Sequence, residues 1–197
     1  MKLTREFYLR SGLEVAHDLI GKQLVHHTPE GIISGLIVEV EAYMGHIDAA
    51  AHSYRASRIG RTAVQYGPGG YAYLFMLYGM HLCMNVVANA EECPEAILIR
   101  ALQPVDGIAL MKSRRKQKDL RNLCNGPGKL TQALGIEKRH YGADLCGEEL
   151  YIESIDMPTP PVSVTKRINI DYSGEAIHYP WRFVWTDSPY ISVPPRC

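Results

Sequence analysis

Neither sign of charge dominates this sequence, in which 21 Lys and Arg residues balance 21 Asp and Glu residues. This neutrality counts against a protein that binds nucleic acid mainly through its net charge, because neutralising phosphates requires Lys and Arg on one surface. A locally basic face is still allowed, since six of the ten residues from Lys112 to Arg121 are Lys or Arg. The balance therefore excludes a uniformly basic protein, but not one that binds DNA through part of its surface.

The five cysteines lack the C-x-x-C spacing that is typical of structural zinc sites. This scatter favours a reducing compartment and argues against zinc. The adjacent His26 and His27 must point to opposite sides of a strand, so we treat them as structural and assign no metal. The N-terminus lacks the apolar core of a secretory signal, and glycine and polar residues interrupt the longest apolar run, residues 71–90. We therefore expect neither export nor a membrane span.

The chain of 197 residues is long enough to bury its own core, and we expect a single domain over residues 1–197. Strand and helix patterns mix without a regular βαβ alternation, which indicates an α+β fold. Helices are expected over residues 12–20, after the cap Ser11, and before Gly135. Strands are expected at residues 22–28, 32–43, 95–104, 162–170 and 181–185.

Residues 71–90 predict a second hairpin, because two apolar runs rich in aromatic residues flank Gly79-Met80, which fits a two-residue turn. Tyr71, Tyr73 and Phe75 share one face of the first run, where core packing is the simplest interpretation. Tyr78 lies beside the turn and has few core neighbours there. Proteins that extract a base from duplex DNA need such a protruding side chain to fill the vacated stack.

Residues 36–43 alternate in the way of a half-buried strand. Leu36, Val38, Val40 and Ala42 are expected to face the core, with Ile37, Glu39, Glu41 and Tyr43 on the other face. A solvated strand face is the simplest interpretation of the two carboxylates, since exposed Glu is common. A carboxylate at the edge of an aromatic pocket can instead activate water as a general base. Residues 44–68, which are polar and irregular, are expected to form a functional loop.

Five stretches carry uncommon combinations of residues: Glu39-x-Glu41-x-Tyr43, "AAAHS" with His52, "YLFMLYGMHLCMN", "AILIRALQP" and "NGPGKLTQALG". Together they resemble the alkyladenine DNA glycosylases, also called 3-methyladenine DNA glycosylases. The similarity runs in order from the N-terminal helix to "YPWRF", and so covers most of the chain. The resemblance implies a monofunctional enzyme that flips an alkylated purine out of duplex DNA and hydrolyses its glycosidic bond. The matching fold is a mixed, mostly antiparallel curved sheet with a protruding β-hairpin, flanked by helices.

The resemblance also implies catalytic roles for particular residues. Glu41 would deprotonate the attacking water, and Arg100 would help to hold that water and the carboxylate. Glu39 would be a supporting carboxylate, and Tyr78 would be the side chain that intercalates into DNA. No lysine lies within the pocket motifs, so we expect hydrolysis without a Schiff base, and no cofactor or metal.

Four residues are implied to form the base-binding pocket. Tyr43 and Phe75 would contact the flipped base mainly through their faces, and His52 through its edge. Asn85 would stand at the pocket wall, where the family uses this position to disfavour normal guanine. A purine alkylated at N3 or N7 is cationic, and aromatic faces attract cations by about 0.5–2 kcal/mol, or more when desolvated. The implied partner is therefore double-stranded DNA with damaged purines, bound by a monomer located wherever the DNA lies.

Two departures from the family pattern concern the pocket and the DNA backbone. Phe75 occupies a position that is commonly tyrosine, so a hydroxyl contact is lost while stacking is kept. Ile59, Thr62 and Gln65 replace expected residues of the loop, in which Arg61 is retained. Arg61 remains a candidate contact to DNA phosphate. A second candidate is Lys129, at the start of a helix after a Gly-rich turn that lacks the residues of a Walker A motif.

The residues alone leave two other functions open. A noncatalytic nucleic-acid binder would explain aromatic residues near a basic segment. A glycosidase or nucleosidase for small substrates would explain the pair Glu39 and Glu41. In such an enzyme the two carboxylates act on opposite sides of the sugar. Two carboxylates that lie only two residues apart on one strand face are poorly placed for this.

Overall fold

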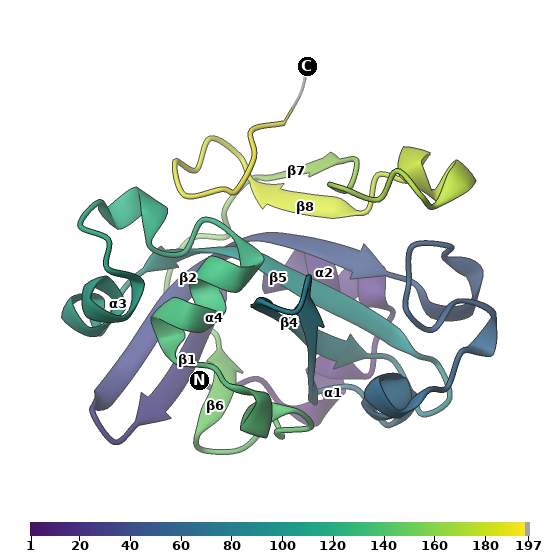
Figure 1. Cartoon of the computed structure of the whole chain (residues 1–197), viewed down its shortest axis with the longest axis horizontal. Coiled ribbons are helices and arrows are strands. Elements are labelled where there is room, and N and C mark those ends of the chain that lie inside the picture. The colour runs from purple at the N-terminus through teal and green to yellow at the C-terminus, as the bar shows by residue number, and fades with distance from the viewer. Residues whose placement is uncertain (196–197) are drawn as a thin grey trace.

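The long strand β2 organises the fold of the computed structural model, which describes residues 1–195 (Figure 1). Strand β1 (Gln23–Thr28) pairs antiparallel with β2 (Gly31–Tyr43), which confirms the first predicted hairpin. The other edge of β2 pairs with β5 (Glu95–Pro104) and, around Glu39–Glu41, β2 also pairs with β8 (Arg182–Trp185). The stretch that carries the two carboxylates therefore lies between β5 and β8.

The sheet has eight strands, in the order β3-β4-β5-β2-β1-β6, with β8 on β2 and β7 on β8. The remaining strands are β3 (Ala72–Leu77), β4 (His81–Ala88), β6 (Leu150–Glu153) and β7 (Val162–Thr165). Every strand pairing is antiparallel among the described residues. The β7–β8 pair forms the upper edge of the molecule in Figure 1. Strand β6 was not predicted, and the strand expected over 162–170 ends at Thr165.

Within residues 1–195, four α-helices and several short 3₁₀ turns accompany the sheet. The helices are α1 (Arg5–Tyr8), α2 (Gly12–Leu19), α3 (Ile108–Arg115) and α4 (Pro127–Leu134). Helix α4 begins with Pro127 in its first turn and ends at Gly135, whose φ of 71° is the left-handed conformation that favours glycine. The turns are η1 (Gly45–Ile47), η2 (Tyr54–Ala56), η3 (Gly60–Tyr66), η4 (Leu120–Asn122), η5 (Lys138–His140) and η6 (Gly174–His178).

One core cluster joins the helices to the sheet. Val15 and Leu19 of α2 and Leu130 and Leu134 of α4 lie in the same buried cluster as the inner residues of β2, β4 and β5. The architecture is thus α+β, with a curved antiparallel sheet flanked by helices, as the sequence indicates. No helix in the described part of the chain is both long and apolar enough to cross a membrane.

A β-bulge in β2 corrects the predicted alternation. The register with β5 shifts on both sides of Glu39, which pairs with Ala101, whereas Ile37 pairs with Leu102 and Val40 with Ile99. The main core consequently takes Ile37 together with Val40 and Ala42, although Ile37 was expected on the carboxylate face. A bulge bends the strand and re-aims the following side chains, so the pattern of the sequence changes phase at this point.

The β3–β4 hairpin also differs from the prediction. Leu77 pairs with His81, so the turn contains Tyr78, Gly79 and Met80 instead of two residues. Tyr78 and Gly79 both have positive φ, at 52° and 68°. The extra residue moves Asn85 opposite Tyr73, whereas a two-residue turn would have placed Asn85 on the other face of the hairpin. The side chains of the tip are solvent-exposed, Tyr78 by 80% and Met80 by 74%.

Truncating the core beneath the β2–β5 pair should destabilise the whole domain. Ile99 is fully buried opposite Val40, so Ile99→Ala should lower the free energy of unfolding by about 2–5 kcal/mol through lost burial and a residual cavity. Urea denaturation measures this change. Ile47→Ala is the control, because Ile47 is 75% exposed and its truncation should change stability by no more than about 0.5 kcal/mol. Equal effects of the two changes would contradict the placement of Ile99 in the core.

Candidate active site

A cavity of about 620 Å³ opens between the β3–β4 hairpin, β2, β5 and the start of α4. Its wall also includes backbone and side chains from residues 168–172. Six of the predicted catalytic, base-binding and intercalating residues line it: Tyr43, His52, Phe75, Tyr78, Asn85 and Arg100. This volume falls in the range of sites for small ligands, and it can hold one purine base.

Glu41 lies fully buried at the floor, just behind the residues that line the cavity. Tyr43 Oη donates a hydrogen bond to Glu41 Oε2 at 2.9 Å, and Arg100 Nη1 donates to the same oxygen at 3.2 Å. The backbone N–H of Ile168 donates to Glu41 Oε1 at 2.7 Å. An ionised carboxylate accepts at about four lone-pair positions, so three donors leave one acceptor position unfilled. All three donors belong to residues that line the cavity.

Glu39 accepts four hydrogen bonds, one of them from the same Arg100 that contacts Glu41. Arg100 Nε and Arg182 Nε donate to Glu39 Oε1 at 2.9 and 2.8 Å, and the hydroxyl of Ser192 donates to the same atom at 2.8 Å. The backbone N–H of Ser192 donates to Oε2 at 2.5 Å. Glu39 therefore ties β2 to β5, β8 and the segment around Ser192. Because Arg100 contacts both carboxylates, Glu39 fixes the guanidinium that orients Glu41.

These contacts determine the protonation states of Arg100 and Tyr43 at the floor of the cavity. Burial works against the charged form of Arg100, but the carboxylates of Glu41 and Glu39 outweigh it and hold the pKa of Arg100 above its ordinary value. Burial, and after it the charge of Glu41, raise the pKa of Tyr43 well above its ordinary value. Tyr43 is therefore a hydrogen-bond donor at neutral pH, and Arg100 is a fixed cation beside Glu41.

A buried ion pair that the sequence analysis did not identify supports the same floor. Arg167 donates to both oxygens of Asp48, at 2.5 and 2.8 Å, and neither side chain is exposed. Arg167 Nη1 also donates to the carbonyl of Ala42, and its guanidinium lies 4.8 Å from the ring centre of Tyr43. This pair anchors the backbone immediately before Ile168, and so positions the amide that contacts Glu41. No local pattern in the sequence links residues 48 and 167.

Three aromatic rings form one side of the cavity. His52 meets Phe75 edge-on at 4.6 Å between ring centres, and Tyr73 stacks on Phe75 at 5.8 Å. His52 Nδ1 and Tyr73 Oη share a hydrogen bond of 2.7 Å. Burial, and after it the positive charge of Arg61, lower the pKa of His52 to about 4. His52 is therefore neutral at physiological pH and does not repel a cationic ligand.

Two amide side chains complete the polar groups of the wall. Asn85 Nδ2 donates to the carbonyl of Tyr73 at 3.1 Å, which fixes the orientation of its amide. Gln65, which the sequence analysis noted only as a departure from the family pattern, also lines the cavity. Gln65 Nε2 is buried and has no hydrogen-bond partner among the described residues. Gln65 is therefore a further polar residue of the wall, which the sequence did not assign to the pocket.

The remaining predicted residues lie around the mouth of the cavity. Lys129 lines it from the first turn of α4, where its ammonium donates to Asn125 Oδ1 at 2.8 Å. Arg61 is exposed in η3 and does not line the cavity, although its charge acts on His52. The structure thus brings the predicted catalytic and base-binding residues to one cavity and places both candidate phosphate contacts near its rim.

A cluster of side chains of the kinds that bind metal ions lies outside this cavity. Among residues 1–195, one group of three His, Cys, Asp or Glu side chains has its ligand atoms close together, namely His26, His140 and Glu149. None of these residues lines the cavity described above.

Comparison with known proteins identifies relatives along almost the whole chain. The family model described as methylpurine-DNA glycosylase matches residues 6–189. A protein of Alkaliphilus oremlandii, provisionally named a 3-methyladenine DNA glycosylase, is 50% identical over 200 residues, which cover 98% of this chain and 99% of the relative. Proteins of Desulfitobacterium hafniense and Clostridium acetobutylicum with the same provisional name are each 46% identical, with 98% of both chains covered.

The neutral state of His52 can be tested directly. An NMR titration of its ring should give a pKa of about 4. Arg61→Gln should raise this pKa by removing a nearby positive charge, but not as far as the ordinary value of 6.5, because burial is the larger cause. Arg58→Gln is the matched control, since Arg58 lies in the same loop and its charge is paired with Glu92. A pKa near 6.5 in the unmodified protein would show that His52 is not buried in this way.

Proposed function

Because the chain belongs to the methylpurine-DNA glycosylase family, we propose that it removes alkylated purines, such as 3-methyladenine, from duplex DNA. In this proposal the damaged base flips into the cavity lined by Tyr43, His52 and Phe75, where its N-glycosidic bond is hydrolysed. The observation that carries the proposal is Glu41, a buried carboxylate with room for one more donor at the floor of a cavity of purine size.

Glu41 acts as the general base in the proposed reaction. It takes a proton from water while the water oxygen attacks C1′ of the deoxyribose, and the bond from C1′ to the purine nitrogen breaks with its electrons passing to the base. The same carboxylate lies near the positive charge that develops on the sugar. Arg100 and the Ile168 amide hold Glu41 in one orientation, so little reorganisation accompanies the reaction.

The cavity wall supports selection of a cationic purine. The faces of Tyr43 and Phe75 attract the positive charge of a base alkylated at N3 or N7, and neutral His52 does not oppose it. That charge also makes the purine a better leaving group, so a damaged base needs less help than a normal one. Asn85, fixed by Tyr73, stands where it can disfavour the exocyclic amine of guanine.

The hairpin tip supports binding to duplex DNA. Tyr78 is exposed at the rim of the cavity, on a turn that projects it beyond the sheet, so it can enter the gap that a flipped base leaves. Lys129 and Arg61 lie near the same rim and can contact phosphates. One chain supplies every residue named, and we propose that it works as a monomer with a single domain over residues 1–197.

The two alternative functions gain no support from the site. A small-substrate glycosidase would need a second free carboxylate opposite Glu41, whereas Glu39 is saturated by Arg100, Arg182 and Ser192. A noncatalytic binder would have no use for a buried carboxylate whose partners leave one position for water.

Glu41→Gln should abolish most turnover while preserving binding to damaged DNA. The amide keeps the size of the side chain but cannot accept the proton, so the rate of 3-methyladenine release from methylated duplex DNA should fall by roughly 10²–10⁴-fold. Glu91→Gln, a change at an exposed carboxylate, is the control and should keep the full rate. Circular dichroism and DNA binding verify that the variant is folded. Normal release by Glu41→Gln, or no release by the unmodified protein, would contradict the proposed function.

Loss of the ring at Tyr78 should impair base flipping. Stacking of a base on an aromatic side chain is worth about 1–3 kcal/mol, so Tyr78→Ser should weaken the flipped state by roughly 5–150-fold. Fluorescence of 2-aminopurine beside the lesion reports this equilibrium. Tyr78→Phe retains the ring and should behave like the unmodified protein. If the serine and phenylalanine variants were equally impaired, the hydroxyl and not the ring would be the functional group.

A further inference from the structure

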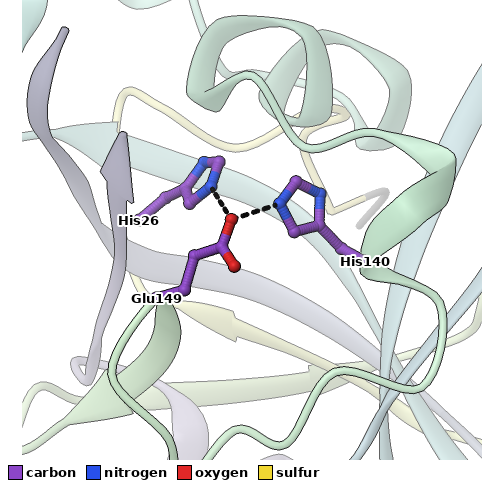
Figure 2. Close-up of side chains that lie close together, drawn as sticks. All are labelled: His26, His140 and Glu149. Atoms are coloured by element: carbon purple, nitrogen blue, oxygen red, sulfur yellow. Dashed lines mark hydrogen bonds and ion pairs between the residues drawn. The ribbon is translucent and has the colours of Figure 1, made fainter. Parts of the chain in front are cut away.

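His26, His140 and Glu149 come together at a place that the proposed reaction does not use (Figure 2). His26 belongs to β1, His140 ends η5, and Glu149 immediately precedes β6. Their ligand atoms all lie within 4.8 Å of one another. His140 Nε2 lies 3.2 Å and His26 Nε2 3.8 Å from the same oxygen of Glu149. From these contacts we propose that the cluster is a structural binding site for Zn²⁺.

The orientation of His26 is that of a metal ligand. His26 Nδ1 lies 2.8 Å from the carbonyl oxygen of Leu134, to which it can only donate, so in the neutral ring the lone pair is on Nε2. Nε2 is buried, points into the cluster and has no hydrogen-bond partner among the described residues. A backbone acceptor on the second nitrogen is the usual support of a zinc-binding histidine.

His140 would change its tautomer on binding a metal. Its Nδ1 accepts a hydrogen bond from the backbone N–H of Glu137 at 2.9 Å, so the proton of the neutral ring is on Nε2, which lies 3.2 Å from Glu149 Oε1. Binding of Zn²⁺ at Nε2 would move this proton to Nδ1, where the carbonyl oxygen of Glu137 lies 3.1 Å away as an acceptor. The ion would thus take the place of the proton between His140 and Glu149, and the Glu137 N–H would lose its acceptor.

The third ligand is adjustable. The side chain of Glu149 is 52% exposed, and its Oε1 also accepts a hydrogen bond from Arg139 at 2.6 Å. Arg139 is itself 55% exposed, so it can move to the second carboxylate oxygen when the first binds a cation. Bonds of about 2.1 Å in tetrahedral geometry place ligand atoms roughly 3.4 Å apart. The Glu149 oxygen lies 3.2 and 3.8 Å from the two histidine nitrogens, and all three ligand atoms lie within 4.8 Å of one another, so the side chains would have to move slightly closer around an ion. Two imidazoles and one carboxylate form a donor set that zinc prefers and that Mg²⁺ and Ca²⁺ do not.

The location indicates a structural role. His26 lines a second cavity, of about 510 Å³, which shares no lining residue with the first. A water molecule would have to supply the fourth ligand. The site lies beside the C-terminal end of α4, whose first turn borders the catalytic cavity. A bound ion would join β1 to η5 and to the residue before β6, both of which come more than a hundred residues later in the chain, and so support the packing of α4.

The test uses full-length protein freed of metal by a chelator and titrated calorimetrically with ZnCl₂. We expect one Zn²⁺ per chain, and an affinity at least about tenfold lower in Glu149→Gln, since even the outer-shell partners of metal ligands are worth roughly 10–100-fold. Glu148→Gln is the matched control, because Glu148 is the adjacent exposed carboxylate and lies outside the cluster. Glu149→Gln alters only a surface side chain, so it avoids the risk that a change at buried His26 prevents folding.

Two further measurements define the site. Co²⁺ in place of Zn²⁺ should give the intense visible absorption of a tetrahedral ion in the unmodified protein. At free Zn²⁺ one hundred times the dissociation constant, the unfolding midpoint should rise by roughly 5–10 °C. The proposal is overturned if no zinc binds, if Glu148→Gln and Glu149→Gln bind it equally, or if the cobalt spectrum is octahedral.

Discussion

The burial of Glu39 and Glu41 is the constraint on which the rest of the site depends. Neither carboxylate is exposed, and a charge in the interior is costly unless paired charges and hydrogen bonds compensate for the lost water. Partners therefore have to reach β2 from β5, from β8 and from the backbone at Ile168. The described core contains three buried carboxylates and three buried guanidiniums, those of Glu39, Glu41, Asp48, Arg100, Arg167 and Arg182. The segments after β6 pack against the sheet because they complete this set.

Such a network contributes order more than stability. Replacing a buried ion pair with apolar residues is often neutral or stabilising, whereas removing one partner leaves an uncompensated charge. The bulge at Glu39 illustrates what the arrangement achieves, because it turns both carboxylates away from the apolar core while Ile37 and Val40 stay within it. A general base that is held by fixed donors does not have to reorganise during a reaction. The proposed chemistry of Glu41 thus depends on burying a charged side chain. The hydrogen bonds and ion pairs from the segments around β2 compensate for the free energy that this burial costs.

The sequence predicts the local features of this molecule and misses the nonlocal ones. The alternation of hydrophobic residues and the positions of turn residues correctly predicted β1, β2 and β5, and Gly135 correctly predicted the end of α4. The three-residue turn at Tyr78 was missed because Tyr78 itself adopts positive φ, which is uncommon for a bulky residue and leaves no signature in composition. Strand β6 was missed although it is as long as β7 and β8, which were predicted. The Asp48–Arg167 pair and the Ile168 amide could not be found, because only the folded chain brings residues so distant in sequence together.

The distribution of charge in the cavity bears on how a damaged base is distinguished. The carboxylates of Glu39 and Glu41 are balanced by Arg100 and Arg182, so the floor carries no net charge with which to attract a cation. His52 is neutral and Tyr43 keeps its proton, so the wall that would face the base is uncharged as well. In the proposed function, attraction of a cationic purine would then come from the aromatic faces, whose quadrupoles act only at contact distance. A cavity with a strong negative field would draw in any cation, including the counterions that surround DNA. An uncharged aromatic wall over a floor of paired charges would instead favour a flat cation of purine shape, and would leave Glu41 to its proposed action on water at the sugar.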